Sequence, residues 1–128
     1  MIDHIDHIVL TTVDEDACVY FYQDILGMKL EVFSENRNAL KFGNQKINIH
    51  VKGKEVEPKA HLPVPGALDL CFITSIPLTD VIENLRTKSV SIAEGPVRRT
   101  GAHGPIESIY LRDPDLNLIE ISQYFTSA

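Results

Sequence analysis

The stretch KINIHV, residues 46–51, decides the fold, because it closes a structural unit that the chain then repeats. Its two isoleucines fall in one row of alternating side chains, and Asn48 and His50 fall in the other. This period of two is typical of a β-strand with one buried face. The later stretch NLIEIS, residues 117–122, has the same alternation, with Glu120 in the polar row. The two stretches therefore predict equivalent closing strands.

The residues before KINIHV predict the rest of a first βαβββ unit. Residues 14–27 have helical spacing, with acidic residues at the start and a glycine at the end. A tight hairpin is expected around the letters GNQ, at 43–45. The expected strands of this unit are HIVLTTV (7–13), MKLEVFS (28–34), NALKFG (38–43) and KINIHV (46–51).

A second βαβββ unit follows a segment with three prolines at 52–66. Residues 77–88 predict an amphipathic helix with proline in its first turn. The expected strands of this unit are ALDLCFIT (67–74), SVSIAEG (89–95), ESIYLRD (107–113) and LNLIEISQYF (116–125). This repeat predicts an α+β fold, a single domain 1–128 built from two βαβββ modules, about 1–54 and 66–128, joined by the Pro-rich linker.

Composition limits the classes of partner. The 128 residues are 44% hydrophobic and 23% charged, as in a globular protein, and no apolar run approaches the roughly 18 residues of a membrane span. The net charge of −6 disfavours nucleic acid, whose phosphates require clustered cations. The N-terminus lacks the basic residues of a secretory signal, and the two cysteines lack metal-type spacing. We therefore expect a cytoplasmic protein with neither nucleic acid nor membrane as partner.

Four metal-capable side chains lie in the polar rows of the first and last strands of the two units. They are His7, His50, Asp69 and Glu120. Two such sheets brought together would converge imidazole and carboxylate groups suited to a divalent cation. His4 falls in the opposite row from His7, so His7 is the expected ligand. The alternative is that these side chains face solvent on one side of an antiparallel sheet.

Four stretches together resemble the vicinal oxygen chelate superfamily, which holds glyoxalase I, extradiol dioxygenases, fosfomycin resistance proteins and bleomycin-binding proteins. They are DHIVLTT (6–12), FYQDILGMKL (21–30), LKFGNQKINIH (40–50) and SIYLRDPDLNLIEI (108–121). The resemblance implies a curled, incomplete eight-stranded barrel around one divalent metal ion, of Ni, Zn, Mn, Fe or Co. It also implies a small-molecule substrate and a homodimer.

The chain departs from the family pattern at two positions. Asp69 stands where many members have a histidine, so it is a weaker candidate ligand than His7, His50 and Glu120. Leu116 stands where a glycine is common, which predicts a different turn or some backbone strain.

The resemblance implies a glyoxalase-type lyase or isomerase, with Glu120 as the base that moves a proton between adjacent carbons. An extradiol dioxygenase is the first alternative, because two histidines and one glutamate form the Fe(II) facial triad. A fosfomycin-type enzyme is the second, with Ser108 and Tyr110 on the substrate side. A binding protein without catalysis is the third.

The glycine-containing segment 97–108 is expected as a loop before a strand that lines the site. Its Arg99 and His103 are candidates to hold an anionic substrate or to form a lid. An exposed loop without function is the alternative for both residues, and solvent exposure is the alternative for Ser108 and Tyr110.

Overall fold

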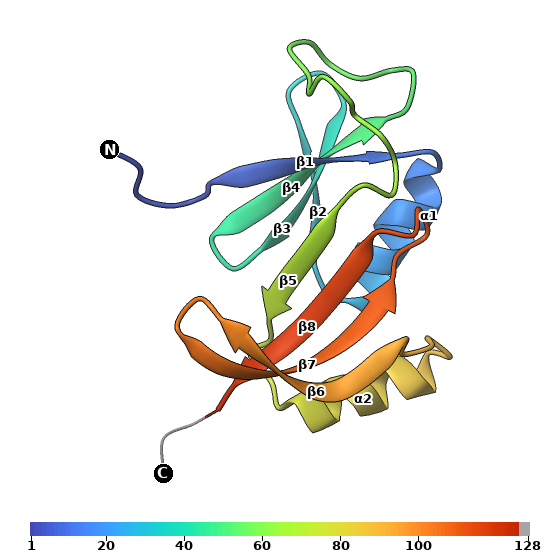
Figure 1. The fold of residues 1–128 in the computed structure, drawn as a ribbon. Helices are drawn as coiled ribbons and strands as arrows, with labels where there is room; N and C mark the ends of the chain where they lie inside the picture. The colour runs from blue at the N-terminus through green and yellow to red at the C-terminus, as the bar shows by residue number, and fades with distance from the viewer. Residues whose placement is uncertain (126–128) are drawn as a thin grey trace. The chain divides into compact units, whose positions relative to one another are not determined.

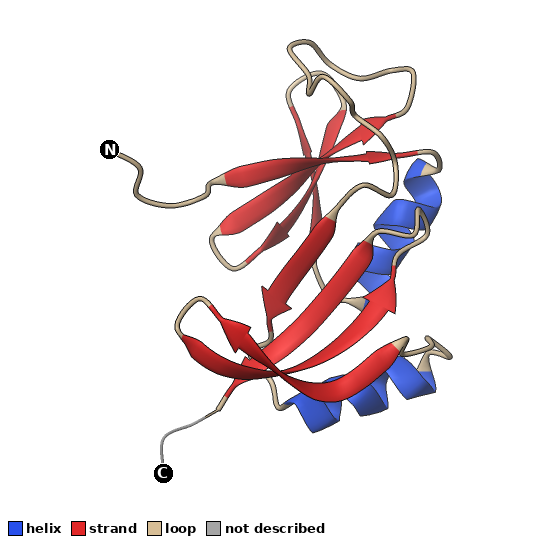
Figure 2. Cartoon of the chain, viewed as in Figure 1, coloured by secondary structure: helices blue, strands red, loops and turns tan. Residues whose placement is uncertain are grey.

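The computed structural model describes residues 1–125, so the last three residues of the expected second module, 126–128, lie outside the described residues. The chain divides into two compact units. Unit 1 comprises 1–68 and 114–116, and unit 2 comprises 69–113 and the residues from Asn117 onward. Each unit contains one four-stranded mixed sheet and one helical segment (Figures 1 and 2).

The sheet of unit 1 has the strand order β1-β4-β3-β2. Its first strand is parallel to its last, and the other neighbours are antiparallel. The expected hairpin around GNQ is confirmed, with Gly43 at φ 52° in the turn. The strands are β1 His7–Thr12, β2 Lys29–Phe33, β3 Arg37–Phe42 and β4 Gln45–Val51.

The helical segment of unit 1 changes its winding partway. α1 (Glu15–Val19) begins at Asp14, whose side chain accepts a hydrogen bond from the Ala17 backbone N–H at 3.1 Å. It continues as a π-helix, η1 (Tyr20–Ile25), where the sequence predicts an ordinary helix. Phe21 and Tyr22 lie in this more widely wound turn, and both are buried.

Unit 2 repeats the arrangement of unit 1, with the strand order β5-β8-β7-β6 and β5 parallel to β8. Its helix, α2 (Leu78–Thr87), lies along the sheet (Figure 1). The Leu78 backbone N–H at the helix start donates to Gln123 Oε1 at 2.9 Å, which ties the helix to β8. The strands are β5 Asp69–Ile73, β6 Glu94–Gly101, β7 Gly104–Arg112 and β8 Leu118–Tyr124.

The strand predicted at 89–95 is wrong, and so is the loop predicted at 97–108. β6 begins only at Glu94 and runs through the two arginines to Gly101, where it turns directly into β7. β6 is an edge strand whose residues are mostly exposed. Without a buried face its sequence shows no alternation, and the apolar Val90 and Ile92 before it imitate one.

The turn between β7 and β8 keeps the left-handed conformation for which a glycine would be expected. Leu116 has φ 69° and is largely exposed. Buried Asp113 and Asn117 close the turn, with the Asn117 backbone N–H donating to Asp113 Oδ1 at 2.9 Å. Asp115 joins unit 1, where its Oδ1 accepts from the Val13 backbone N–H at 3.0 Å. The departure at Leu116 is therefore one of backbone strain, because a leucine occupies this left-handed conformation.

Both sheets bury one apolar row of side chains. Fully buried examples in unit 1 are Leu10, Leu40 and Ile47, and in unit 2 Ile109, Leu111 and Ile119. The α+β fold with two βαβββ repeats is thus confirmed. Among the described residues, no helix has the length and apolar character that crossing a membrane requires.

Candidate functional site

The face of each sheet opposite the buried apolar row carries the candidate site residues. In unit 1 this polar face holds His7 on β1, Asn48 and His50 on β4, and cations on β3 and β2. In unit 2 the corresponding face holds Asp69, Cys71, Ser108, Tyr110, Glu120 and Ser122. All eight site residues of the sequence analysis except His103 lie in strands.

The register of β1 and β4 separates the two histidines of unit 1. His7 is opposite Lys46, whereas His50 is opposite Thr11, four positions farther along. At about 3.3 Å per residue, four positions correspond to about 13 Å along the strands. The sheet therefore places the two imidazoles on the same face without bringing them together.

The two parallel strand pairs define equivalent positions in the repeat. Asp69 begins β5 and Glu120 is opposite Cys71, two positions farther along. In unit 1, His7 begins β1, and Asn48 is opposite Val9, which lies two positions after His7. Asn48 is thus the structural equivalent of Glu120, and His50 is the equivalent of Ser122. The sequence repeat alone paired His50 with Glu120.

His50 is 5% exposed, and its Nε2 is buried without a hydrogen-bond partner. Burial lowers the pKa of its imidazole below the ordinary value, and the nearby Arg37 guanidinium lowers it further, whereas Glu55 acts in the opposite direction. A neutral imidazole with a free nitrogen is the form that binds a metal ion. Asn48, two residues away on the same face, also has a buried oxygen, Oδ1, without a partner.

His7 is exposed, and its Nδ1 lies 2.8 Å from Asp6 Oδ2. The contact with His7 lowers the pKa of the Asp6 carboxyl. A carboxylate at one ring nitrogen orients an imidazole and leaves the other nitrogen for a ligand. His4 makes the same kind of contact with Asp3, so this contact does not distinguish the two histidines.

Glu120 belongs to a hydrogen-bonded row of small polar groups in unit 2. The Ser108 hydroxyl donates to Glu120 Oε2 at 2.6 Å, and the Ser122 hydroxyl lies 3.3 Å from the same oxygen. Ser108 and Ser122 are both fully buried, and their hydroxyl oxygens lie 2.6 Å apart. These contacts fix the orientation of the carboxylate on the sheet.

Cys71 extends this row toward the exposed Asp69 on the edge strand β5. Its Sγ lies 3.3 Å from the Ser122 hydroxyl. Burial raises the pKa of the Cys71 thiol, an effect that the Ser122 hydrogen bond reduces and the charge of Glu120 reinforces. This shift favours the protonated thiol, which is a poorer nucleophile than the thiolate.

Arg99 lies in β6, and its guanidinium contacts Tyr110 and Glu94. Arg99 Nε donates to the Tyr110 hydroxyl at 3.1 Å, and Arg99 Nη2 is 3.4 Å from Glu94 Oε1. The hydrogen bond to Tyr110 raises the pKa of Arg99 above its usual value. His103 lies in the β6–β7 turn, where its backbone N–H donates to the Tyr124 hydroxyl at 3.1 Å. Arg99 and Tyr110 are therefore joined, and His103 is apart from them in the sheet.

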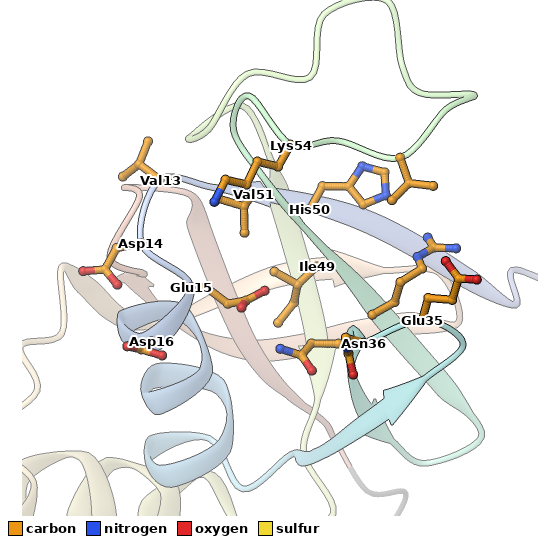
Figure 3. Close-up of a pocket in the computed structure, with 13 residues that line it drawn as sticks. Val13, Asp14, Glu15, Asp16, Glu35, Asn36, Ile49, His50, Val51 and Lys54 are labelled. Carbon is orange, nitrogen blue, oxygen red and sulfur yellow. The ribbon is translucent and has the colours of Figure 1, made fainter.

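A cavity of about 650 Å³ lies within unit 1 where the ends of β1 and β4 meet the start of α1 (Figure 3). Its volume is in the range of small-molecule sites. Four carboxylates and two cations line it together with His50, and the Glu15 carboxylate points toward Ile49 in Figure 3. The lining residues are Val13, Asp14, Glu15, Asp16, Glu35, Asn36, Arg37, Asn38, Ile49, His50, Val51, Lys54 and Val56.

Sequence reasoning missed Asn48 as an equivalent of Glu120 and missed the charged residues that line the cavity. The strand register, which no alternation pattern encodes, is needed to find Asn48. Glu15, Glu35 and Lys54 lie at helix and strand ends, where charged residues are ordinary. No signal in the sequence marks them.

Within residues 1–125, no three His, Cys, Asp or Glu side chains are grouped closely enough to hold a metal ion. Within unit 1 the donor atoms nevertheless fit one in part, because the buried Nε2 of His50 and the buried Oδ1 of Asn48 are ligand atoms without partners. Within unit 2, Glu120 is an oriented carboxylate.

The paired βαβββ units define the glyoxalase-like fold. A crystal structure of lactoylglutathione lyase from Agrobacterium tumefaciens matches it with a TM-score of 0.70 at 20% identity, covering 94% of this chain and 92% of that chain. TnmS3, an antibiotic binding protein from Streptomyces sp. CB03234, matches with a TM-score of 0.74 at 19% identity, covering 97% and 98%. At these identities the two structures show the fold alone.

The model of the Glyoxalase/Bleomycin resistance protein/Dioxygenase superfamily matches residues 4–121, and the chain belongs to this family. It is 56% identical to Virulence protein STM3117 of Salmonella typhimurium over 97% of this chain and 86% of that protein. A crystal structure of that protein gives a TM-score of 0.96 with 98% and 99% coverage. The chain is also 52% identical to Glyoxalase domain-containing protein RDO1 of Mycosarcoma maydis, over 94% of this chain and 68% of that protein.

Proposed function

We propose that this protein is a divalent-metal-dependent enzyme of the glyoxalase type, which isomerises a small substrate with two neighbouring oxygens. The observation that carries the proposal is the buried His50 Nε2, neutral and without a partner, on the polar face that also presents His7. The equivalent face of unit 2 presents Asp69 and Glu120. Family membership supports the same class of chemistry.

In this proposal the metal ligands come from His7, Glu120, one residue of β4 and, more weakly, Asp69. His50 is the candidate on β4 from the sequence, although the register puts it about 13 Å along the strands from His7. A bound divalent ion of the Ni, Zn, Mn, Fe or Co type would stabilise the negative charge that develops on the two substrate oxygens. Asn48 joins the candidates, because it occupies the position equivalent to Glu120 and its Oδ1 lacks a partner. His50 and Asn48 are thus alternative contributions from β4.

Glu120 is the proposed base that takes a proton from one carbon and returns it to the next. The hydroxyl of Ser108 donates to Oε2 and holds the carboxylate in one orientation, so the base does not have to be ordered during the reaction. Tyr110 is directly opposite Glu120 in the β7–β8 register and holds Arg99 beside it. Arg99 and Tyr110 are the proposed substrate contacts on this side, and His103 is a weaker one. Ser108, expected from the sequence to contact the substrate, is fully buried and acts instead by orienting Glu120.

Metal analysis of the purified full chain tests the proposal. His7→Ala and Glu120→Ala should lose the metal, whereas His4→Ala and Glu107→Ala should keep it. His4 is a matched control because it makes the same contact with a preceding aspartate, and Glu107 lies on the neighbouring strand facing the other way. Comparing Asn48→Ala with His50→Ala identifies the ligand from β4. Metal loss in the controls, or retention in His7→Ala and Glu120→Ala, would refute this site.

Turnover assays then separate the classes of reaction. A hemithioacetal should be isomerised by the metal-loaded protein and not by Glu120→Ala. Oxygen consumption with catechols would indicate the dioxygenase alternative, and consumption of fosfomycin with a thiol would indicate the fosfomycin alternative.

A non-catalytic binding protein is the second candidate, supported by the cavity of about 650 Å³ in unit 1. Ligand binding without metal and without turnover would favour it. A homodimer remains part of the proposal, supported by family resemblance and by the edge strands β1 and β5, which carry the exposed Val9 and Ile73. Light scattering of the purified chain measures the oligomeric state.

A further inference from the structure

Three lysines occupy one line across the polar face of unit 1. Lys29 on β2 is opposite Lys41 on β3, and Lys41 is opposite Lys46 on β4. Lys46 is in turn opposite His7 on β1, so the line crosses all four strands. We call Lys29, Lys41 and Lys46 the basic row.

Like charges directly opposite each other destabilise a sheet. Only part of the positive charge in the basic row is compensated. Lys41 Nζ lies 3.3 Å from Glu31 Oε2, and Lys46 Nζ lies 3.9 Å from the centroid of the Phe33 ring. Among the described residues, no carboxylate pairs with Lys29 or Lys46. The stability that the sheet loses through this row is a reason to expect an external partner.

The surrounding charges strengthen this expectation. Arg37, on the same face, lies with its guanidinium carbon 4.9 Å from the centroid of the same Phe33 ring. With the three lysines it makes four cations, against the carboxylates of Glu31 and of Asp6, whose pKa the charge of Lys46 helps to lower. The chain as a whole has a net charge of −6, so this group of cations contrasts with the net charge of the molecule. A positive face on an acidic protein attracts anions selectively.

The chemistry of the row indicates a compact ligand. The side chains of Lys41 and Glu31 are 48% and 42% exposed, so a dissolved ligand can reach them. The row spans three strands, about 10 Å at the spacing of neighbouring strands. A nucleic acid requires a longer track of phosphate contacts and an overall basic domain. A small oxyanion with more than one negative charge fits the row better.

We infer that the basic row of unit 1 binds a small, multiply charged oxyanion, a carboxylate or a phosphate-like group. This deepens the proposed function and rests on it in one respect: because His7 is directly opposite Lys46, the anion would be the charged part of the substrate whose chelating oxygens lie near His7. Anion binding by the row itself does not require the metal.

Calorimetric titration of the metal-free full chain tests the inference, with metal removed by a chelating resin. The probes are inorganic phosphate and malonate, titrated separately at constant ionic strength. At least one should bind, and the one that binds identifies a phosphate-like or a carboxylate ligand. Lys46→Gln and Lys29→Gln should each weaken binding about tenfold, the loss of one hydrogen bond to a charged group. Lys52→Gln, an exposed lysine outside the row, should bind as the wild type does.

The inference is overturned if neither anion binds, if the two row variants bind unchanged, or if Lys52→Gln loses as much affinity as they do. Binding of a duplex oligonucleotide without binding of either small anion would also overturn it. The His7→Ala variant separates the two proposals. If it loses metal and still binds the anion, both stand; if wild-type protein keeps metal and binds no anion, only this inference fails.

Discussion

The same βαβββ unit builds two polar faces with opposite characters. In unit 2 the polar groups satisfy one another, since Ser108 and Ser122 contact each other and both contact Glu120. In unit 1 the polar face carries lysines opposite lysines and two buried atoms without partners, on Asn48 and His50. The polar groups of unit 2 are hydrogen-bonded to one another, whereas those of unit 1 include charges and buried atoms that a ligand could pair with. The predictions for Ser108, Lys29 and His50 test this difference, and a further one compares the hairpin turns of the two units.

The largest effect is expected from Ser108→Ala in unit 2. The variant removes a buried hydroxyl that donates to a carboxylate at 2.6 Å, so the free energy of unfolding should fall by about 2 kcal/mol. Urea unfolding measures it. Combining this change with Glu120→Gln in a double-mutant cycle isolates the pair, and independent effects of the two changes would contradict a network in unit 2.

The repeated hairpins allow a second comparison, between Gly43 in unit 1 and Leu116 in the β7–β8 turn. Both have positive φ, 52° and 69°. A Cβ on Gly43 would meet no atom within 4 Å, so Gly43→Ala should cost about 1 kcal/mol through backbone strain alone. Leu116→Gly should raise the free energy of unfolding by somewhat less than about 1 kcal/mol. Glycine relieves the strain at positive φ, but it loses more conformational entropy on folding than leucine does. The urea midpoint should therefore fall in Gly43→Ala and rise in Leu116→Gly.

Sequence analysis predicted the fold well because the repeat depends on alternation, helix ends and turns, which are local. It failed at β6, an edge strand that is mostly exposed and therefore has no alternation of apolar and polar residues in its sequence. It identified His7, Asp69 and Glu120 as polar-face residues because alternation assigns a face. It could not align one strand with its neighbour, so it matched His50 with Glu120 where the register matches Asn48, and it did not find the basic row.

The third prediction concerns the like charges of unit 1. Lys29→Gln should raise the free energy of unfolding by a few tenths of a kcal/mol at low ionic strength, because it removes a charge directly opposite Lys41. The gain should disappear at high salt, where exposed charges are screened. Lys52→Gln is the control, and denaturant midpoints at two salt concentrations give the comparison. A gain that persists in high salt would show that charge repulsion is not its cause.

The last prediction concerns the pH dependence that His50 gives to unit 1. Burial, followed by Arg37, lowers the pKa of this imidazole, so below the ordinary histidine pKa of about 6.5 the unfolded chain binds a proton that the folded protein does not. Stability should be fully present above that pH and should fall as the pH drops through it toward the lowered pKa. Urea midpoints of metal-free protein at several pH values between 7.5 and 5 measure the slope. His50→Gln should reduce this slope, whereas His103→Gln, at an exposed position in unit 2, should leave it unchanged. Equal slopes in wild type and His50→Gln would mean that the buried, unpartnered nitrogen of unit 1 does not resist protonation, and the contrast between the two faces would then rest on the lysines alone.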